Sequence, residues 1–132
     1  MTREDRNIDI ELIGFDADDT LWENESIFYD VQKKINKLLE IHNDDFNKEL
    51  YRVEKQNLEY YGYGIKGFVL SIIETSLKLS NKKLDNRIIL EILDLGKKML
   101  HTKVKLWPNV KSSLEALSKN YQLILITKGD LL

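Results

Sequence analysis

The chain has 132 residues, of which 42% are hydrophobic and 32% charged, and its formal net charge is −2. This composition is typical of a folded globular domain, its charge gives no basic surface for nucleic acid, and the lack of cysteine excludes disulfides and thiolate metal sites. The first residues are charged and lack the apolar core of a secretion signal, and no apolar run approaches the ~20 residues of a membrane span. We therefore expect a cytoplasmic protein with neither a nucleic-acid nor a membrane partner.

The first predicted element is a short buried strand over residues 8–15, which ends at a pair of carboxylates within Phe15-Asp16-Ala17-Asp18-Asp19-Thr20-Leu21. In an extended chain, residues i and i+2 point to the same side, and at the carboxyl end of a parallel strand that side faces the ligand crevice of α/β proteins. Two acids that converge there repel each other unless a cation or a shared proton intervenes. Asp16 and Asp18 therefore predict a hard metal ion and phosphate chemistry, with one carboxylate as nucleophile and the other as acid/base.

The hydrophobic period becomes helical in the middle of the chain. Apolar residues at three- and four-residue intervals predict four amphipathic helices, near 26–41, 44–61, 66–80 and 86–101. Asn43 or Asp44 is the expected N-cap of the second helix and Asp85 that of the fourth. The glycines at 62, 64 and 67 separate the second helix from the third.

The last part of the chain returns to a strand. A fifth helix is expected from Pro108 to about Lys119, with Pro at its first position and Asn120 as a left-handed C-cap. The apolar run over residues 121–127 predicts a second strand, which ends at Thr127. The order of strand, helical insert, helix and strand means that the chain leaves a parallel sheet and returns to it.

These patterns resemble the haloacid dehalogenase (HAD) superfamily. Asp16-x-Asp18-x-Thr20 after an apolar strand is similar to its first motif, and the strand ending in Thr127 is similar to its second. Pro108-Asn109-Val110 resembles the point where the chain of family members returns from an inserted cap domain, and residues 61–67 resemble one subgroup of uncharacterised HAD hydrolases. The resemblance implies an α/β fold with a partial Rossmann-like core of about two parallel strands.

The resemblance also implies a division into two domains. Residues 1–22 and 106–132 would form the incomplete core, and residues 23–105 a helical cap. Trp22 and Trp107 flank the expected hinges, where we interpret them as packing residues.

By the same resemblance, Asp16 is the nucleophile that forms an aspartyl-phosphate and Asp18 is the acid/base. Mg²⁺ would bind the Asp16 carboxylate and the main-chain carbonyl of Asp18. Thr127 would bind the transferring phosphoryl group; Lys128 is either a second phosphate ligand or a solvated cation, and Thr20 braces the loop. Dehalogenases of this superfamily generally lack the second Asp, so Asp18 favours a phosphatase acting on a small phosphorylated metabolite.

The family's third motif, a Lys, and its fourth, an acidic pair, lie downstream of the second motif, and this sequence ends five residues past Thr127. We therefore expect the 132-residue chain alone to be inactive or impaired, and to self-associate or be complemented through open strand edges. The alternative is a non-catalytic fragment or remnant of such a hydrolase that needs another polypeptide. A phospho-acceptor receiver domain is less favoured, because receivers lack the helical insert.

Overall fold

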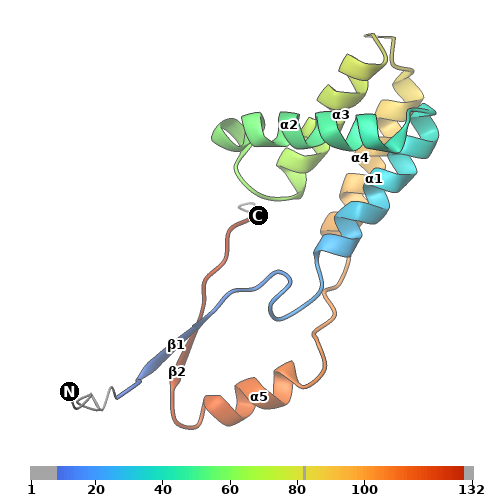
Figure 1. Cartoon of the computed structure of the whole chain (residues 1–132). Coiled ribbons are helices and arrows are strands. Elements are labelled where there is room, and N and C mark those ends of the chain that lie inside the picture. Colours follow the sequence, from blue (N-terminus) through green and yellow to red (C-terminus); the bar gives the residue numbers. More distant parts are fainter. Residues whose placement is uncertain (1–8, 82, 130–132) are drawn as a thin grey trace. The chain divides into compact units, whose positions relative to one another are not determined.

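The computed structural model describes residues 9–81 and 83–129, which form two compact units (Figure 1). Residues 9–23 and 104–127 make up an α/β unit, and the other described residues, which include 128 and 129, make up a helical unit. The chain is thus α/β in class, with most of its residues helical.

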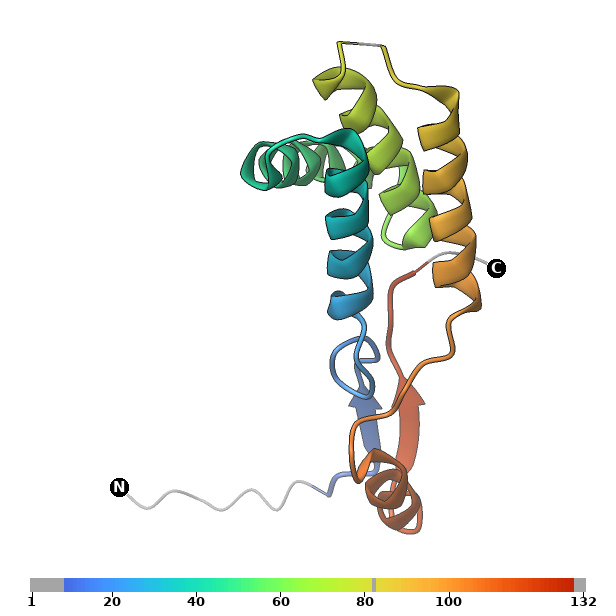
Figure 2. The same ribbon diagram turned by 90° about the vertical axis from the view of Figure 1, so that its right-hand side faces the viewer.

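The α/β unit contains β1 (Leu12–Phe15), α5 (Val110–Leu117) and β2 (Gln122–Leu125). The two strands pair in parallel, with Phe15 opposite Leu125, and Figure 2 shows them side by side. Pairing continues past β2, because the amide of Ile126 donates a hydrogen bond to the carbonyl of Phe15 at 2.7 Å. The carboxyl ends of both strands therefore lie at one edge of the sheet, as the sequence predicts.

One face of this sheet is apolar and exposed. Side chains alternate between the faces of a strand, and a Cβ built on Gly14 would lie 2.8 Å from Ile126 and 3.6 Å from Ile124, so these residues share a face. Leu12, Ile124 and Ile126, which we call the open sheet face, are between 43% and 60% exposed.

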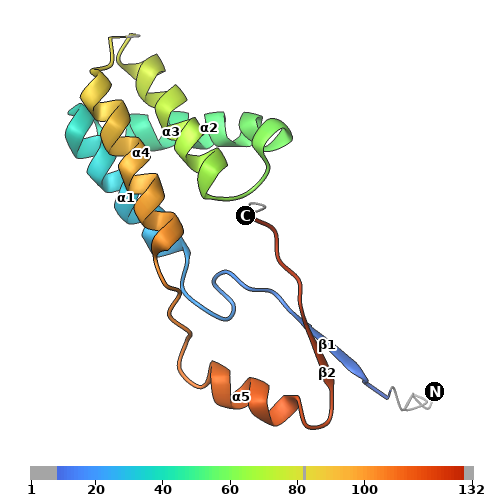
Figure 3. The same ribbon diagram turned by 180° about the vertical axis from the view of Figure 1, so that it is seen from behind.

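The helical unit contains α1 (Glu25–Leu39), α2 (Asn43–Tyr61), α3 (Ile65–Leu79) and α4 (Asn86–His101). α3 packs against α2 and α4, and α1 contacts the same two helices (Figure 3). Each helix contributes apolar residues from one face to a shared core, which includes Ile35, Phe46, Leu50, Ile72 and Ile92. None of the helices formed by the described residues is long and apolar enough to cross a membrane.

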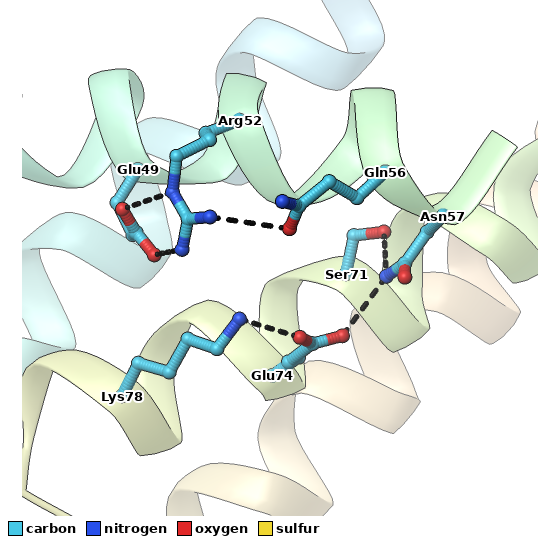
Figure 4. Close-up of polar contacts among 7 residues, drawn as sticks. All are labelled: Glu49, Arg52, Gln56, Asn57, Ser71, Glu74 and Lys78. Carbon is cyan, nitrogen blue, oxygen red and sulfur yellow. Dashed lines mark hydrogen bonds and ion pairs between the residues drawn. The ribbon is translucent and has the colours of Figure 1, made fainter.

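A polar cluster fixes α2 against α3 beside this core (Figure 4). The amide nitrogen of Asn57 donates to Ser71 Oγ at 3.1 Å and to Glu74 Oε2 at 3.0 Å. Glu74 also accepts a hydrogen bond from Lys78, and these two donors, Lys78 first, hold the pKa of the Glu74 carboxyl below its usual range. Because polar partners require defined geometry, the cluster specifies one register between the two helices.

The four predicted helices of the insert are confirmed to within two residues at each end. Asp85 is confirmed as an N-cap, since its carboxylate accepts a hydrogen bond from the amide of Arg87 at 2.8 Å. The predicted cap at Asn43 or Asp44 is wrong, because α2 begins at Asn43 with His42 in the cap position. Gly67 lies inside α3 rather than in the break before it, where only Gly62 and Gly64 have positive φ angles.

The fifth helix is also found to within two residues at each end, but the residues predicted to begin and cap it are wrong. Pro108 does not begin it, because Asn109 takes a left-handed conformation, with φ of 66°, and α5 starts one residue later. Asn tolerates this conformation better than most residues, so it makes a turn before the helix. At the other end, Ser118 rather than Asn120 is the C-cap, and it is right-handed.

Candidate functional site

A tight loop follows β1 and is built by backbone hydrogen bonds. The amides of Thr20 and Leu21 donate to the carbonyl of Ala17 at 3.1 and 2.8 Å, and the amide of Asp19 donates to the carbonyl of Trp22 at 2.7 Å. Asp19 has a φ of 58°, a left-handed conformation that Asp adopts more readily than most residues. Ala17 and Leu21 are buried and anchor the loop. The loop is therefore fixed by its own backbone.

The two predicted catalytic carboxylates project from this loop and are exposed. Each has a separate hydrogen-bond donor four residues further along the chain. Thr20 Oγ1 donates to Asp16 Oδ2 at 3.1 Å, and Trp22 Nε1 donates to Asp18 Oδ1 at 2.8 Å. The predicted bracing role of Thr20 agrees with its bond to Asp16. The sequence did not predict the hydrogen bond from Trp22 to Asp18. The only indication of it in the sequence is a tryptophan four residues after an aspartate.

The loop ends in a neck that holds the outgoing and returning segments of the α/β unit together. Trp22 forms an antiparallel backbone bridge with Leu106, and the amide of Trp107 donates to the carbonyl of Leu21 at 3.0 Å. We define the neck as residues 21–22 and 106–107. Because Trp22 belongs both to the neck and to the loop, it joins Asp18 to a paired stretch of backbone.

Thr127 lies at the same edge of the sheet as the acidic loop. The pairing of Phe15 with Leu125 and the bond from the Ile126 amide bring the two chain segments side by side just before Asp16 and Thr127. Lys128 has a different contact, because its ammonium lies 5.1 Å from the centroid of the Tyr63 ring.

The oxygens of this loop fit a hard divalent cation. Asp16 offers a carboxylate, and no backbone amide among residues 9–81 and 83–129 donates to the main-chain carbonyl of Asp18. Magnesium is commonly held by one or two carboxylates while it keeps waters and substrate oxygens. In the same residues no group of three or more His, Cys, Asp or Glu side chains comes together to hold a metal. The Asp16 carboxylate and the Asp18 carbonyl are thus oxygens of the kind that such a cation binds.

Comparison with known proteins supports the resemblance in fold. No protein-family model and no curated protein matches the sequence. The structure is similar to that of a haloacid dehalogenase-like family hydrolase from Xanthomonas campestris, with a TM-score of 0.85 and 36% identity over 92% of this chain and 52% of that chain.

Two further solved structures share the fold at lower identity. A 2-haloacid dehalogenase from Pseudomonas syringae pv. tomato DC3000 has a TM-score of 0.54 and 21% identity over 89% of this chain and 55% of that chain. A predicted phosphoglycolate phosphatase from Haemophilus somnus 129PT has a TM-score of 0.52 and 21% identity over 92% and 52% of the two chains. This chain spans about half the length of each of these relatives. The solved structures that this chain resembles are thus haloacid dehalogenase-like hydrolases, and the chain matches about half of each of them in fold.

Proposed function

We propose that this chain provides the nucleophile and the acid/base of a Mg²⁺-dependent, cytoplasmic phosphatase that acts on a small phosphorylated metabolite. The observation that carries the proposal is the second carboxylate, Asp18, held on the same fixed loop as Asp16. Displacement of a halide needs no proton donor, whereas an alkoxide leaving group does. Since the named relatives include both a dehalogenase and a phosphatase, this residue favours phosphoryl transfer.

In the proposed reaction, a carboxylate oxygen of Asp16 attacks phosphorus while the bond to the leaving oxygen breaks, and Asp18 protonates that oxygen. Asp18 then takes a proton from the water that attacks the aspartyl-phosphate, which releases inorganic phosphate and restores Asp16. The Thr127 hydroxyl donates to a phosphoryl oxygen. Mg²⁺, held by the Asp16 carboxylate and the Asp18 carbonyl, would neutralise the phosphoryl oxygens.

The first prediction concerns the nucleophile and uses the natural full-length protein. Asp16→Asn removes the attacking carboxylate, so turnover of a phosphate monoester with Mg²⁺ should fall to background. Acid quenching during turnover of the unsubstituted protein should trap a phosphorylated residue that maps to Asp16. Asp30→Asn, at an exposed position of α1, is the matched control and should leave turnover unchanged. Activity that survives Asp16→Asn would reject the aspartyl-phosphate.

The second prediction concerns the acid/base. Asp18→Asn should lower turnover of an alkyl phosphate by roughly 10²–10⁴-fold, the usual contribution of general acid–base catalysis. An aryl phosphate with an acidic leaving group needs less protonation and should lose less. Mg²⁺ affinity should change little, because the proposed metal ligand at this position is the main-chain carbonyl. Equal losses on both substrates would contradict the role given to Asp18.

A second candidate function is that of a non-catalytic fragment. It is supported by the coverage, since relatives are about twice as long as this chain. The 132-residue chain would then bind Mg²⁺ weakly and show little or no turnover until further polypeptide is supplied. A Mg²⁺-dependent phosphatase assay of this chain beside the full-length protein separates the two candidates, because robust turnover by the 132-residue chain excludes the second.

A further inference from the structure

Trp22 is held by hydrogen bonds both at its backbone and at its ring nitrogen. Its backbone carbonyl accepts the Asp19 amide at 2.7 Å, and its backbone is bridged to Leu106 in the neck. Its ring nitrogen donates to Asp18 Oδ1 at 2.8 Å, a distance typical of a good hydrogen bond to a carboxylate. The Asp18 side chain is otherwise exposed to solvent. A large, anchored ring thus aims a donor at one oxygen of a small, exposed acid.

We propose that Trp22 is a positioning residue that selects which oxygen of Asp18 carries the catalytic proton. An indole nitrogen is a hydrogen-bond donor only and cannot accept a proton. While it donates to Oδ1, it favours the neutral form of Asp18 in which Oδ1 is the carbonyl oxygen, because a carbonyl oxygen accepts a hydrogen bond better than a hydroxyl oxygen does. The proton that Asp18 gives to the leaving oxygen is then carried on Oδ2. This inference rests on the phosphatase function proposed above.

Positioning matters at this site because an exposed Asp side chain would otherwise move between several rotamers. A general acid must come within about 3 Å of the oxygen that it protonates, and a misplacement of about 1 Å costs up to ~10²-fold in rate. Thr20 restrains Asp16 in the same loop by a separate hydrogen bond. The two carboxylates are thus oriented independently, and loss of the indole should affect Asp18 alone.

The first test asks whether the hydrogen bond forms, and it does not depend on activity. The ring N–H of Trp22 is observed by NMR in the full-length protein labelled with nitrogen-15 and is assigned by its loss in Trp22→Phe. Asp18→Ala removes the acceptor and should shift this signal and speed its exchange with water. Asp30→Ala is the control and should leave the signal in place. If Asp18→Ala changes neither the chemical shift of the indole N–H nor its exchange rate with water, the proposal is overturned.

The second test measures its catalytic consequence. Trp22→Phe keeps an aromatic ring but removes the N–H, so kcat on an alkyl phosphate should fall about 10- to 100-fold. KM, and kcat on an activated aryl phosphate, should change less than about twofold, because binding and attack by Asp16 are untouched. Trp107→Phe is the matched control: it makes the same change in the neck, where the Trp107 side chain has no hydrogen bond within residues 9–81 and 83–129.

The outcomes separate this inference from the proposed function. If Asp18→Asn shows the dependence on the leaving group but Trp22→Phe does not, the positioning role is wrong and the phosphatase mechanism stands. If neither variant shows a dependence on the leaving group, the acid/base role of Asp18 is wrong, and the positioning role of Trp22, which rests on it, is wrong as well. If Trp22→Phe lowers kcat equally on both substrates, Trp22 is structural and the proposal is overturned.

Discussion

At the scale of single residues, the Thr20 hydroxyl restrains the proposed nucleophile directly. Thr20 Oγ1 donates to Asp16 Oδ2 at 3.1 Å across a loop that is already closed by backbone hydrogen bonds. The bond limits the rotamers of the Asp16 side chain and so orients the carboxylate for the proposed attack on phosphorus. Hydrogen bonds to charged groups contribute more than neutral ones, although solvent weakens them at an exposed site.

A substitution at Thr20 tests this restraint. Thr20→Val has nearly the same shape but lacks the donor, and it should lower kcat/KM of the full-length protein on a phosphate monoester by about tenfold, or ~1.4 kcal/mol. Thr20→Ser keeps the hydroxyl and should stay within about threefold of the unsubstituted protein. Equal kcat/KM for the Val and unsubstituted proteins would show that the bond to Asp16 has no part in catalysis.

The sequence predicts a site residue well when the pattern that identifies the residue lies within a few neighbouring positions of the chain. Asp16 and Asp18 lie within one short motif directly after a strand, so spacing alone brings them to one edge of the sheet. The bond from Trp22 to Asp18 depends instead on a turn in which Asp19 is left-handed. The neighbouring sequence does not predict that turn, because glycine is the usual signal for a positive φ angle and the residue at position 19 is Asp.

At the scale of helices, one glycine sets the approach of α3 and α4. A Cβ built on Gly96 would lie 2.5 Å from Val69 Cγ2, far inside the ordinary contact distance. Val69 is buried and its branched side chain has little rotamer freedom, so it cannot give way easily. Gly96 therefore serves close packing, although glycine lowers helix propensity by about 1 kcal/mol relative to alanine.

Gly96→Ala should consequently destabilise the helical unit despite its better helix propensity. Overpacking a core typically costs about 1–3 kcal/mol, which leaves a net loss of roughly 1 kcal/mol, measured by chemical denaturation. Val69→Ala removes the clashing methyl groups, so the double variant should be more stable than the sum of the two single changes predicts. Strict additivity of the two changes would show that the contact between α3 and α4 does not constrain position 96.

Glu54 of α2 gives the helical unit a defined pH dependence. Burial raises the pKa of the Glu54 carboxyl above its usual range. The folded protein therefore keeps this proton at a pH where the unfolded chain has lost it. The contribution to stability is fully present below the unfolded pKa and is lost as pH rises through the folded pKa.

Glu54→Gln removes the partly buried ionisable carboxyl and should raise the melting temperature at pH 7, with the advantage disappearing in acid. Thermal unfolding followed by circular dichroism at a series of pH values measures this difference. Glu59→Gln is the matched control, because Glu59 is exposed on the same helix, and its difference from the unsubstituted protein should not grow with pH. A Glu54→Gln protein that is less stable at pH 7 would contradict the assignment.

The helices themselves follow from a periodic signal, whereas their ends do not. Because apolar residues recur over about four turns, one atypical residue does not hide the helical period, and all four helices of the insert could be predicted. A cap depends on one or two residues. Pro108 and Asn109 together fit both a helix start and a turn, and the turn is what forms. The contact between Gly96 and Val69 joins different helices, which periodicity cannot reveal.

At the scale of the whole molecule, the described residues of the α/β unit form a sheet of two strands, whose open sheet face consists of Leu12, Ile124 and Ile126. Parallel sheets are normally covered on both faces, and unpaired strand edges invite pairing with other chains. The Xanthomonas relative has about as much polypeptide again as the part that this chain matches. We therefore propose that further polypeptide covers this face in the full-length protein, and that a second copy of the chain covers it when such polypeptide is absent.

Sedimentation velocity tests the proposal on the 132-residue chain beside the full-length protein. Full burial of a large aliphatic side chain contributes about 1.5–3 kcal/mol, so three half-exposed ones and an open edge favour association at roughly 100 µM and above. Ile124→Lys should reduce association of the 132-residue chain, since a charge on the open sheet face resists burial. Leu90→Lys, at an exposed position of α4, is the control and should not reduce it. A monomer at every concentration would mean that this face is stable in water, and would contradict the proposal that a second copy covers it.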